Sequence, residues 1–271
     1  MKIIKFFVTL ILFFSFAGQG FAFSGISQDY NEKFKFHIFK IDLDKHAKKI
    51  HPYVVKDDLK TTRDVFFDNN FMLVVNGGFF DMKTGGAVSY VTQDYKTVSS
   101  PFENLNLIQN LASQNRLENV LNRAELRILE NEITGDLKFD IDYHFAPIKK
   151  GYRIKHSLQA GPMIEPDLDL AKESFVVYDE NSIPKAQYTD VLKRRPRTIL
   201  ALKDNNLYII IFTDFSPVTI GEARRALAKY NFKKIMALDG GGSTSINYKD
   251  FEIYSTKGEP RELKSFLVIE K

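Results

Sequence analysis

The chain has 271 residues, a formal net charge of +4 and no cysteine, with 44% hydrophobic and 27% charged residues. These values are typical of a globular protein, and they exclude a disordered chain, a coiled coil and any thiol or disulfide chemistry. The positive charge is too weak and too scattered to indicate nucleic-acid binding, which needs a concentrated basic face.

The first 22 residues have the pattern of a secretory signal peptide. Lys2 and Lys5 precede an apolar run over 6–16, and small residues follow up to Ala22. The run is shorter than the ~20 apolar residues that span a bilayer, and no cysteine follows it to carry the acyl chains of a lipoprotein. We therefore expect cleavage after Ala22, no membrane span afterwards, and a periplasmic or extracellular mature protein.

The remaining chain, 23–271, shows no repeat or linker and is expected to form one domain. Apolar residues alternate over 34–43 but change phase after Ile38, which predicts a strand with a bulge near its middle. Residues 62–69 favour a short helix. The apolar run 71–75 is typical of a strand buried on both faces.

A helical insertion is predicted between 103 and 132, where apolar residues recur every three or four positions with long polar gaps. It would either cover the active face as a lid or, more simply, pack on the back of the sheet. The strict alternation over 137–143 then predicts a strand.

The last third begins with a predicted hairpin. The apolar runs 198–202 and 207–213 are separated by a turn containing Asp and Asn, residues that tolerate the left-handed backbone of a tight turn. Thr219 and Glu222 then have the spacing of a capping box, in which each side chain accepts a hydrogen bond from a free N–H group at the start of a helix.

Further strands are predicted over 234–238, 251–254 and 265–269. Because strands alternate with helices and also pair as hairpins, we expect an α+β (mixed α/β) fold with a mixed, largely antiparallel sheet and flanking helices. No GxGxxG links a strand to a helix, so a dinucleotide-binding unit is not predicted.

The strongest local feature lies at the end of the strand 234–238. Asp239 is followed by Gly240, Gly241 and Gly242 and then by Ser243, so backbone N–H groups can approach a ligand closely there and hold an anion. Considered alone, the segment is more simply interpreted as a tight turn.

A second buried strand ends in a similar loop. Asn76 and Gly77 follow the run 71–75, and Asp81 comes shortly after them. Two strand ends of this kind predict a shared cleft, and Gly161 belongs to a third small-residue turn that we expect to line it. The alternative is a glycine-rich bend whose two phenylalanines fill the core.

Charged residues flank two other predicted strands. Arg195 and Arg197 precede one of them, and the planar fork of arginine suits phosphate. Asp214 directly follows another, as Asp239 does. The five histidines show no metal-ligand spacing, so we predict no metal site and no cofactor, although a divalent cation held by the aspartates stays an alternative.

These motifs together resemble the phosphodiester glycosidase family. The segments that carry the resemblance are, in chain order, VVNGGFFD, GPM, RPRT, TD followed by VTIGEARRAL, LDGGGSTS and PREL. The resemblance extends from Phe34 to the C-terminus and is loosest over 81–159. It implies hydrolysis of a sugar 1-phosphodiester at the sugar carbon, which releases a sugar and a phosphomonoester.

Under this resemblance Arg197 binds the phosphate, Asp239 acts at the anomeric carbon as base or oxocarbenium stabiliser, and Asp214 is the other carboxylate. Asn76 would hold a sugar hydroxyl. The other expected contacts to the phosphorylated carbohydrate are Gly77, Asp81, Gly161, Arg195, Gly240, Gly241, Gly242 and Ser243. Two other functions remain: a non-catalytic envelope protein that binds glycans, and an ordinary glycoside hydrolase on the same scaffold.

Overall fold

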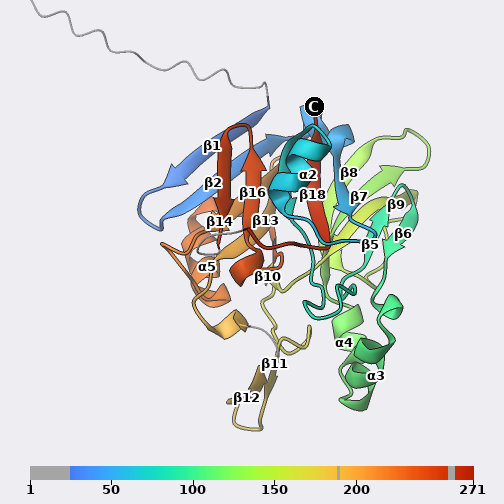
Figure 1. Ribbon diagram of the computed structural model, residues 1–271, viewed down its shortest axis with the longest axis vertical. Coiled ribbons are helices and arrows are strands. Elements are labelled where there is room, and N and C mark those ends of the chain that lie inside the picture. The colour runs from blue at the N-terminus through green and yellow to red at the C-terminus, as the bar shows by residue number, and fades with distance from the viewer. Residues whose placement is uncertain (1–24, 188–189, 256–259) are drawn as a thin grey trace, which may run out of the picture.

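The structure, a computed structural model, describes residues 25–187, 190–255 and 260–271, so the expected leader lies outside the described residues. Three sheets and a two-stranded hairpin form most of the protein (Figure 1). All strand pairs within the three sheets are antiparallel. The predicted α+β fold with largely antiparallel pairing is confirmed. The expected single mixed sheet is wrong, because the described strands divide among three sheets and pair antiparallel within each of them. Within the described ranges, no helix is long and apolar enough to cross a membrane.

The first sheet contains the predicted hairpin at its centre. Its strands, in the order β1-β2-β14-β13-β15-β10, are β1 (Ile26–Asn31), β2 (Phe36–Asp42), β14 (Asn206–Phe212), β13 (Arg197–Lys203), β15 (Lys234–Ala237) and β10 (Met163–Glu165). β13 and β14 pair without interruption from Arg197 opposite Phe212 to Lys203 opposite Asn206. The strand–turn–strand prediction is therefore confirmed.

The bulge predicted in β2 is wrong. β2 pairs with β1 and with β14 without any shift of register. Its apolar residues change phase because the sheet is covered on both faces: Phe36 and Ile38 pack into one core, whereas Phe39 and Ile41 pack into the other. A change of phase in the apolar alternation is thus found in a regular strand that is buried on both faces as well as in a strand with a bulge.

The second sheet delivers the Asn76 loop. Its strands, in the order β17-β16-β4-β18-β3, are β17 (Phe251–Tyr254), β16 (Ser245–Tyr248), β4 (Phe71–Asn76), β18 (Ser265–Glu270) and β3 (Ile50–Val54). All six residues of β4 are buried, as the apolar run predicted. The predicted helix forms as α2 (Thr62–Asp68), which packs against this sheet (Figure 1).

The third sheet lies beside the second. Its strands, in the order β6-β5-β9-β7-β8, are β6 (Lys96–Ser99), β5 (Val91–Gln93), β9 (Tyr152–Gln159), β7 (Ala124–Asn131) and β8 (Leu137–Tyr143). The strand predicted over 137–143 is confirmed as β8.

The helical region predicted over 103–132 is wrong in its second half. Only η2 (Pro101–Glu103), α3 (Leu105–Ser113) and α4 (Leu117–Leu121) are helical there, and the strand β7 follows. In β7, Ala124, Leu126 and Ile128 point into the core. Ala124 and Ile128 alone matched a helical stripe. Leu126 lies between them on the same face, and the three alternate with side chains that face the other way, as a strand requires.

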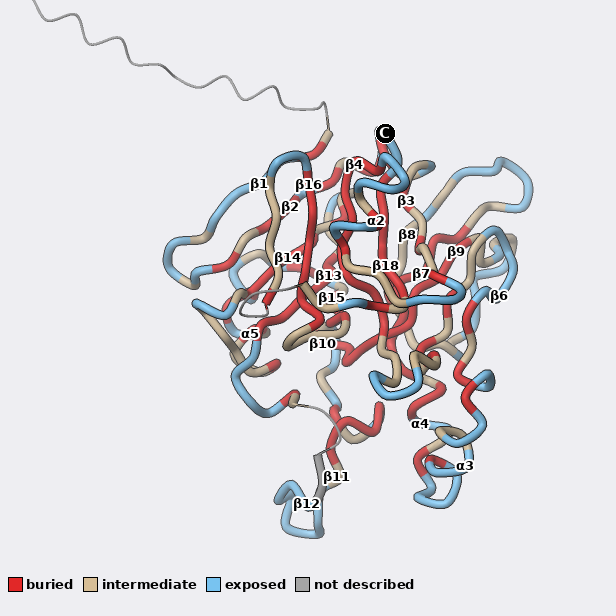
Figure 2. The backbone as a smooth tube through the Cα atoms, viewed as in Figure 1, coloured by how far each residue is buried: buried red, intermediate tan, exposed pale blue. Residues whose placement is uncertain are grey.

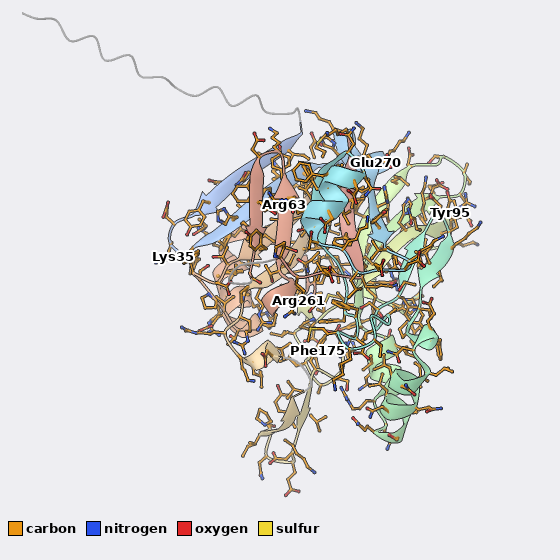
Figure 3. The ribbon with its side chains drawn as sticks, in the orientation of Figure 1. Lys35, Arg63, Tyr95, Phe175, Arg261 and Glu270 are labelled. Carbon is orange, nitrogen blue, oxygen red and sulfur yellow. The ribbon has the colours of Figure 1, made fainter. Side chains whose placement is uncertain are left out.

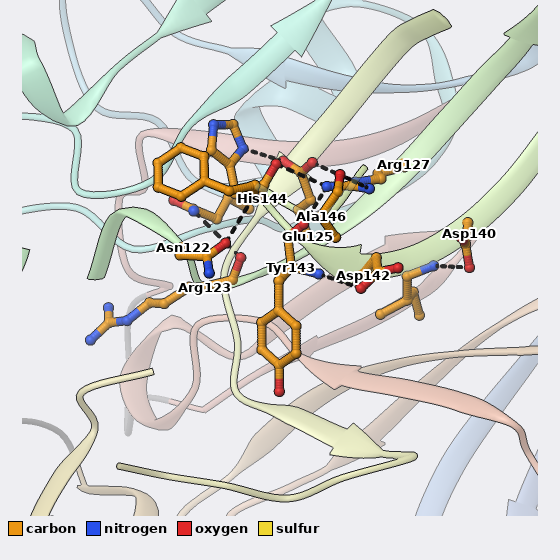
Figure 4. Close-up of polar contacts among 12 residues, drawn as sticks. Asn122, Arg123, Glu125, Arg127, Asp140, Asp142, Tyr143, His144 and Ala146 are labelled. Carbon is orange, nitrogen blue, oxygen red and sulfur yellow. Dashed lines mark hydrogen bonds and ion pairs between the residues drawn. The ribbon is translucent and has the colours of Figure 1, made fainter. Parts of the chain in front are cut away.

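The other face of β7 carries a buried ion pair. The Nε atom of Arg127 lies 2.8 Å from Oε1 of Glu125, and both side chains are almost fully buried. The Arg127 guanidinium also donates to the backbone carbonyls of Tyr143, His144 and Ala146 (Figure 4). Both charged groups have partners inside the protein, so they can be buried. Their presence in the sequence therefore does not mean that this face of β7 is exposed.

The remaining elements lie around the sheets: α1 (Leu43–His46), α5 (Ile220–Leu227), η1 (Ala47–Lys49), η3 (Asp190–Leu192), η4 (Ala228–Tyr230), η5 (Gly241–Ser243) and the hairpin of β11 (Val176–Tyr178) and β12 (Pro184–Gln187). α5 begins with the predicted capping box, since the Thr219 hydroxyl accepts from Glu222 N (3.1 Å) and Thr219 N donates to the Glu222 carboxylate (3.0 Å). In Figure 1, α3, α4 and the β11–β12 hairpin project from one end of the body.

The core joins all three sheets. One buried cluster draws residues from each of them, and a second lies between the first sheet and α5. Figure 2 shows the strands buried in the interior and much of the surface exposed in the projecting segments. The end of β4 meets the end of β15 here, because Asp239 N donates to the carbonyl of Gly77 (3.1 Å). The two glycine loops noted in the sequence are therefore neighbours in space.

Candidate active site

A cleft of about 700 Å³ opens where these strand ends meet. Eight of the twelve predicted site residues line it: Gly161, Arg195, Arg197, Asp214, Asp239, Gly240, Gly241 and Gly242. The other four, Asn76, Gly77, Asp81 and Ser243, lie outside its lining. Neither α3 nor α4 contributes a residue to the described lining of the cleft, so the alternative in which the helical insertion is a lid gains no support.

Asp239 occupies the centre of the site. Its carboxylate accepts a hydrogen bond from Gly240 N at 2.8 Å. Burial raises the pKa of Asp239 to about 6, and this effect exceeds the lowering by the Ser243 hydroxyl, the Gly240 N–H and two arginines. The carboxyl group can therefore gain or lose a proton near neutral pH.

Arg197 is held rigidly beside it. The side chain is only 6% exposed. Its Nε donates to the carbonyl of Val218 (3.0 Å), and its Nη2 donates to those of Asp190 (2.6 Å) and Lys193 (2.7 Å). Burial lowers the pKa of Arg197 to about 10, which keeps the guanidinium charged at neutral pH. The backbone therefore orients a cation at the wall of the cleft.

Arg261 is a second cation that was not singled out from the sequence. It lines the cleft, and its charge lowers the pKa of Asp239. A Cβ atom at Gly242 would overlap its guanidinium, so glycine at that position makes room for it. Arg261 is labelled near the centre of Figure 3. Its only sequence signal is its place in the PREL segment.

The glycine loop is tied to the protein by its own N–H groups. Gly240 N donates to the Asp239 carboxylate, Gly241 N to the carbonyl of Pro196 (2.9 Å), and Ser243 N to the carbonyl of Gly240 (3.2 Å). Gly241 has φ of +60°, which favours glycine. Because the N–H groups of Gly240, Gly241 and Ser243 already have acceptors, the arginines offer more hydrogen-bond donors to an incoming anion than these three groups do.

Asn76 and Gly77 connect the strand ends. The Asn76 amide donates to the carbonyl of Asp239 (2.7 Å) and accepts from the Thr198 hydroxyl (2.6 Å) and from Ser245 N (3.2 Å). Asn76 is fully buried. A Cβ atom on Gly77 would lie 2.6 Å from the Ser265 backbone. Both residues thus position Asp239, and no sugar contact is assigned to them.

Asp81 stabilises a turn at the rim of the cleft. Its carboxylate accepts from Lys83 N (2.9 Å), and this bond holds the pKa of Asp81 below its usual value. Phe79 and Met82, on either side of that position, line the cleft instead. The segment that follows β4 therefore reaches the cleft through Phe79 and Met82 rather than through Asp81.

Gly161 lies over a buried acid. It has φ of +99°, and a Cβ atom there would lie 2.5 Å from Oε1 of Glu173. Glu173 accepts from the backbone N–H groups of Ala124 and Met163, both at 2.7 Å. Burial raises the pKa of Glu173 to about 7. Glu173, which sequence reasoning missed, thus supports this wall of the cleft from behind.

The remaining charges lie nearer the surface. Asp214 is exposed two residues after β14 and lines the cleft. Nε of Arg195 lies 2.8 Å from a carboxylate oxygen of Asp190, and Nε of Arg194 donates to Glu222 (3.1 Å). Since these two arginines have acidic partners, Arg197 and Arg261 are the cations best placed to hold an anion beside Asp239.

Comparison with known proteins identifies related folds. A family model for phosphodiester glycosidases matches residues 69–270. The catalytic domain of zebrafish N-acetylglucosamine-1-phosphodiester α-N-acetylglucosaminidase, auto-inhibited by its pro-peptide, has a TM-score of 0.61 at 14% identity, with 91% of this chain and 81% of that chain covered. No curated protein matches the chain by sequence.

Two bacterial structures are also similar. A hypothetical protein from Synechocystis has a TM-score of 0.52 at 10% identity, covering 90% of this chain and 61% of that one. A protein from Burkholderia pseudomallei that is described as exported has a TM-score of 0.54 at 11% identity, covering 87% and 74%. At these identities the structural likeness shows a common fold.

Proposed function

Because the chain belongs to the phosphodiester glycosidase family, we propose that it hydrolyses the glycosidic bond of a sugar 1-phosphodiester and releases a sugar and a phosphomonoester. The observation that carries this proposal is a partly buried carboxyl group, Asp239, flanked by the guanidinium groups of Arg197 and Arg261 in one cleft. Two neighbouring cations suit a phosphate, and the carboxyl group suits the sugar carbon beside it.

The two arginines act on the leaving group. When the bond between the anomeric carbon and the phosphate oxygen breaks, both electrons go to that oxygen and the phosphate charge grows from −1 to −2. Preorganised cations stabilise charge that develops in the transition state. Since the second pKa of a phosphomonoester is ~6, the departing group needs no proton from a general acid at neutral pH.

The carboxylates act on the sugar. We propose one of two roles for Asp239. It either accepts a proton from the water molecule that adds to the anomeric carbon, or it stabilises the positive charge that develops on that carbon. Its pKa of about 6 leaves it ionised but still basic at neutral pH. Asp214 supplies the second carboxylate from beyond the end of β14, which is separated from β15 by β13. Asn76 is a positioning residue, since it holds the Asp239 backbone.

We further propose that the protein works outside the cytoplasm. The charged, apolar and small-residue regions of 1–22 support export. The fold is also that of a Burkholderia protein described as exported. The substrate would then be a phosphorylated glycan of the cell envelope or its surroundings.

The test compares the release of free sugar from para-nitrophenyl α-glycosides with release from matched sugar 1-(methyl phosphate) diesters. We expect release only from the diesters, lost in Asp239→Asn and retained in the exposed control Asp58→Asn. Comparable release from the nitrophenyl glycosides would indicate an ordinary glycoside hydrolase. Binding of a diester by the folded protein without release would indicate a glycan-binding protein.

A further inference from the structure

A second hollow of about 600 Å³ adjoins the cleft. The two share Asp214, and Tyr254 of the hollow is followed directly by Ser255 of the cleft. The walls of the hollow come from β1, β2 and β17 and from the turn after β14. The hollow and the cleft are therefore neighbours, and a ligand with its reacting carbon at Asp239 lies beside the hollow.

Aromatic side chains line the hollow. Tyr30 is 39% exposed and Phe215 is 96% exposed, and Tyr254 contributes a third ring. A single exposed phenylalanine needs no explanation. Three aromatic rings around one hollow beside an active site, however, form a surface on which the apolar C–H face of a sugar ring can pack.

Two residues that line the hollow each have a buried polar atom without a hydrogen-bond partner among the described residues. Nδ1 of His37 and Oε1 of Glu252 are buried, and neither has a hydrogen bond within the part of the chain that the structure describes. Buried polar atoms in proteins are nearly always paired. Burial also lowers the pKa of His37, which leaves its imidazole neutral at pH 7. An acceptor and a neutral imidazole suit the hydroxyl groups of a sugar.

The charge of the hollow differs from that of the cleft. Four arginines line the cleft, whereas the described lining of the hollow has the carboxylates Asp214 and Glu252 and no arginine or lysine. Carboxylates repel phosphate and accept hydrogen bonds from neutral hydroxyl groups. The phosphate therefore belongs with the arginines, and an uncharged part of the substrate belongs in the hollow.

We propose that this hollow is a subsite for a second, neutral sugar, joined to the sugar that carries the phosphodiester. The substrate is then an oligosaccharide 1-phosphodiester, and the enzyme releases a product of at least two sugars. The subsite contains Tyr30, His37, Asp214, Phe215, Glu252 and Tyr254. This assignment rests on the proposed function, because that function places the sugar at Asp239 and the phosphate at Arg197.

The test measures kcat/KM for matched pairs of methyl phosphodiesters: N-acetylglucosamine and N,N′-diacetylchitobiose, glucose and maltose, mannose and mannobiose. We expect one disaccharide diester to exceed its monosaccharide counterpart by at least tenfold. Phe215→Ala and Tyr254→Ala should bring this ratio towards one. Phe67→Ala is the matched control, since Phe67 is 67% exposed and lines a different hollow, and it should preserve the ratio.

Ratios near or below one for every pair would overturn the subsite while leaving the proposed function intact. If the wild-type protein cleaves no diester, the proposed function fails, and the subsite is judged by NMR titration of the methyl glycosides of the three disaccharides. Binding that Phe215→Ala weakens tenfold and Phe67→Ala does not would support the subsite. Absence of binding, or equal weakening in both variants, would refute it.

Discussion

The side-chain amide of Asn76 donates a 2.7 Å hydrogen bond to the backbone carbonyl of Asp239, across 163 positions of the sequence. The same amide accepts hydrogen bonds from Thr198 and Ser245. Asn76→Ala would leave three buried groups without partners, so we expect the free energy of unfolding to fall by about 2 to 4 kcal/mol. We also expect kcat to fall more than KM rises, because Asp239 shifts while the substrate contacts stay.

Urea denaturation and steady-state kinetics of Asn76→Ala measure both effects. The matched control is Asn119→Ala, in which an exposed amide loses one long hydrogen bond of 3.4 Å. It should change stability by less than about 0.5 kcal/mol. A loss of stability in Asn76→Ala without any change in kcat would contradict the positioning role.

Asp239 makes stability depend on pH. Its pKa is about 6 in the folded protein and 3.8 for an unperturbed aspartate, so the folded state binds more protons between these values. Stability therefore falls as pH rises from about 4 to about 6. Asp239→Asn removes this penalty, and we expect it to be more stable than wild type at pH 8 by about 3 kcal/mol. The difference should disappear at pH 3.5, which urea denaturation at the two pH values would check.

Arg261 holds down the pKa of Asp239. Arg261→Gln removes this positive charge, so the pKa should rise above about 6. If ionised Asp239 is the base, the acid limb of kcat/KM against pH should move to higher pH. Arg153→Gln, an exposed substitution on β9, should leave the limb in place. An unchanged limb in Arg261→Gln would show that Arg261 does not act on the titrating group.

Gly242 provides a second test of Arg261. A Cβ atom there would overlap the Arg261 guanidinium, the far end of a flexible side chain, so the fold can adapt by displacing that group. We expect Gly242→Ala to change the free energy of unfolding by less than about 1 kcal/mol while lowering kcat/KM about as much as Arg261→Gln does. Thermal unfolding and kinetics of the two variants and their double mutant measure these effects. We expect the double mutant to lose little more kcat/KM than either single variant, because both act through the Arg261 guanidinium.

Gly161 and Gly135 form a matched pair for backbone strain. Both have positive φ, +99° and +74°, but a Cβ atom meets Glu173 at 2.5 Å in the first case and nothing within 4 Å in the second. Gly135→Ala should cost about 1 to 2 kcal/mol of stability. Gly161→Ala should cost at least ~1 kcal/mol more, since it adds a steric overlap with a buried side chain. Equal losses of stability in the two variants would mean that the Glu173 side chain can move away from the added Cβ atom without a cost in free energy.

Local signals in the sequence were sufficient for much of the fold. The run 71–75, the capping box at Thr219 and the hairpin after Arg197 depend on neighbouring residues, and all three were predicted correctly. The strand β7 was mistaken for helix because Ala124 and Ile128 have helical spacing and the charged residues Glu125 and Arg127 suggested an exposed face, although the two form a buried ion pair. The sequence cannot reveal that compensation, since the carbonyl groups that complete it come from residues 143–146.

In the site, too, features that depend on neighbouring residues were predicted, whereas those that depend on distant contacts were not. The strand ends that carry Asp214 and Asp239 were visible because a polar residue follows an apolar run. Arg261 and Glu173 were not, because their importance comes from contacts with Gly242 and Gly161, residues distant in the sequence. Asn76 was recognised as important, but its buried hydrogen bonds could be seen only in the structure.

The hydrogen bonds of Asn76 also mean that residues from most of the chain must be present before the site can form. They join positions 76, 198, 239 and 245, so a nascent chain that has not yet supplied Ser245 has no complete site. A chain exported unfolded would therefore cross the membrane as an inactive polypeptide. Its activity would begin only with the completion of folding, which would spare phosphorylated sugars in the compartment where it is made.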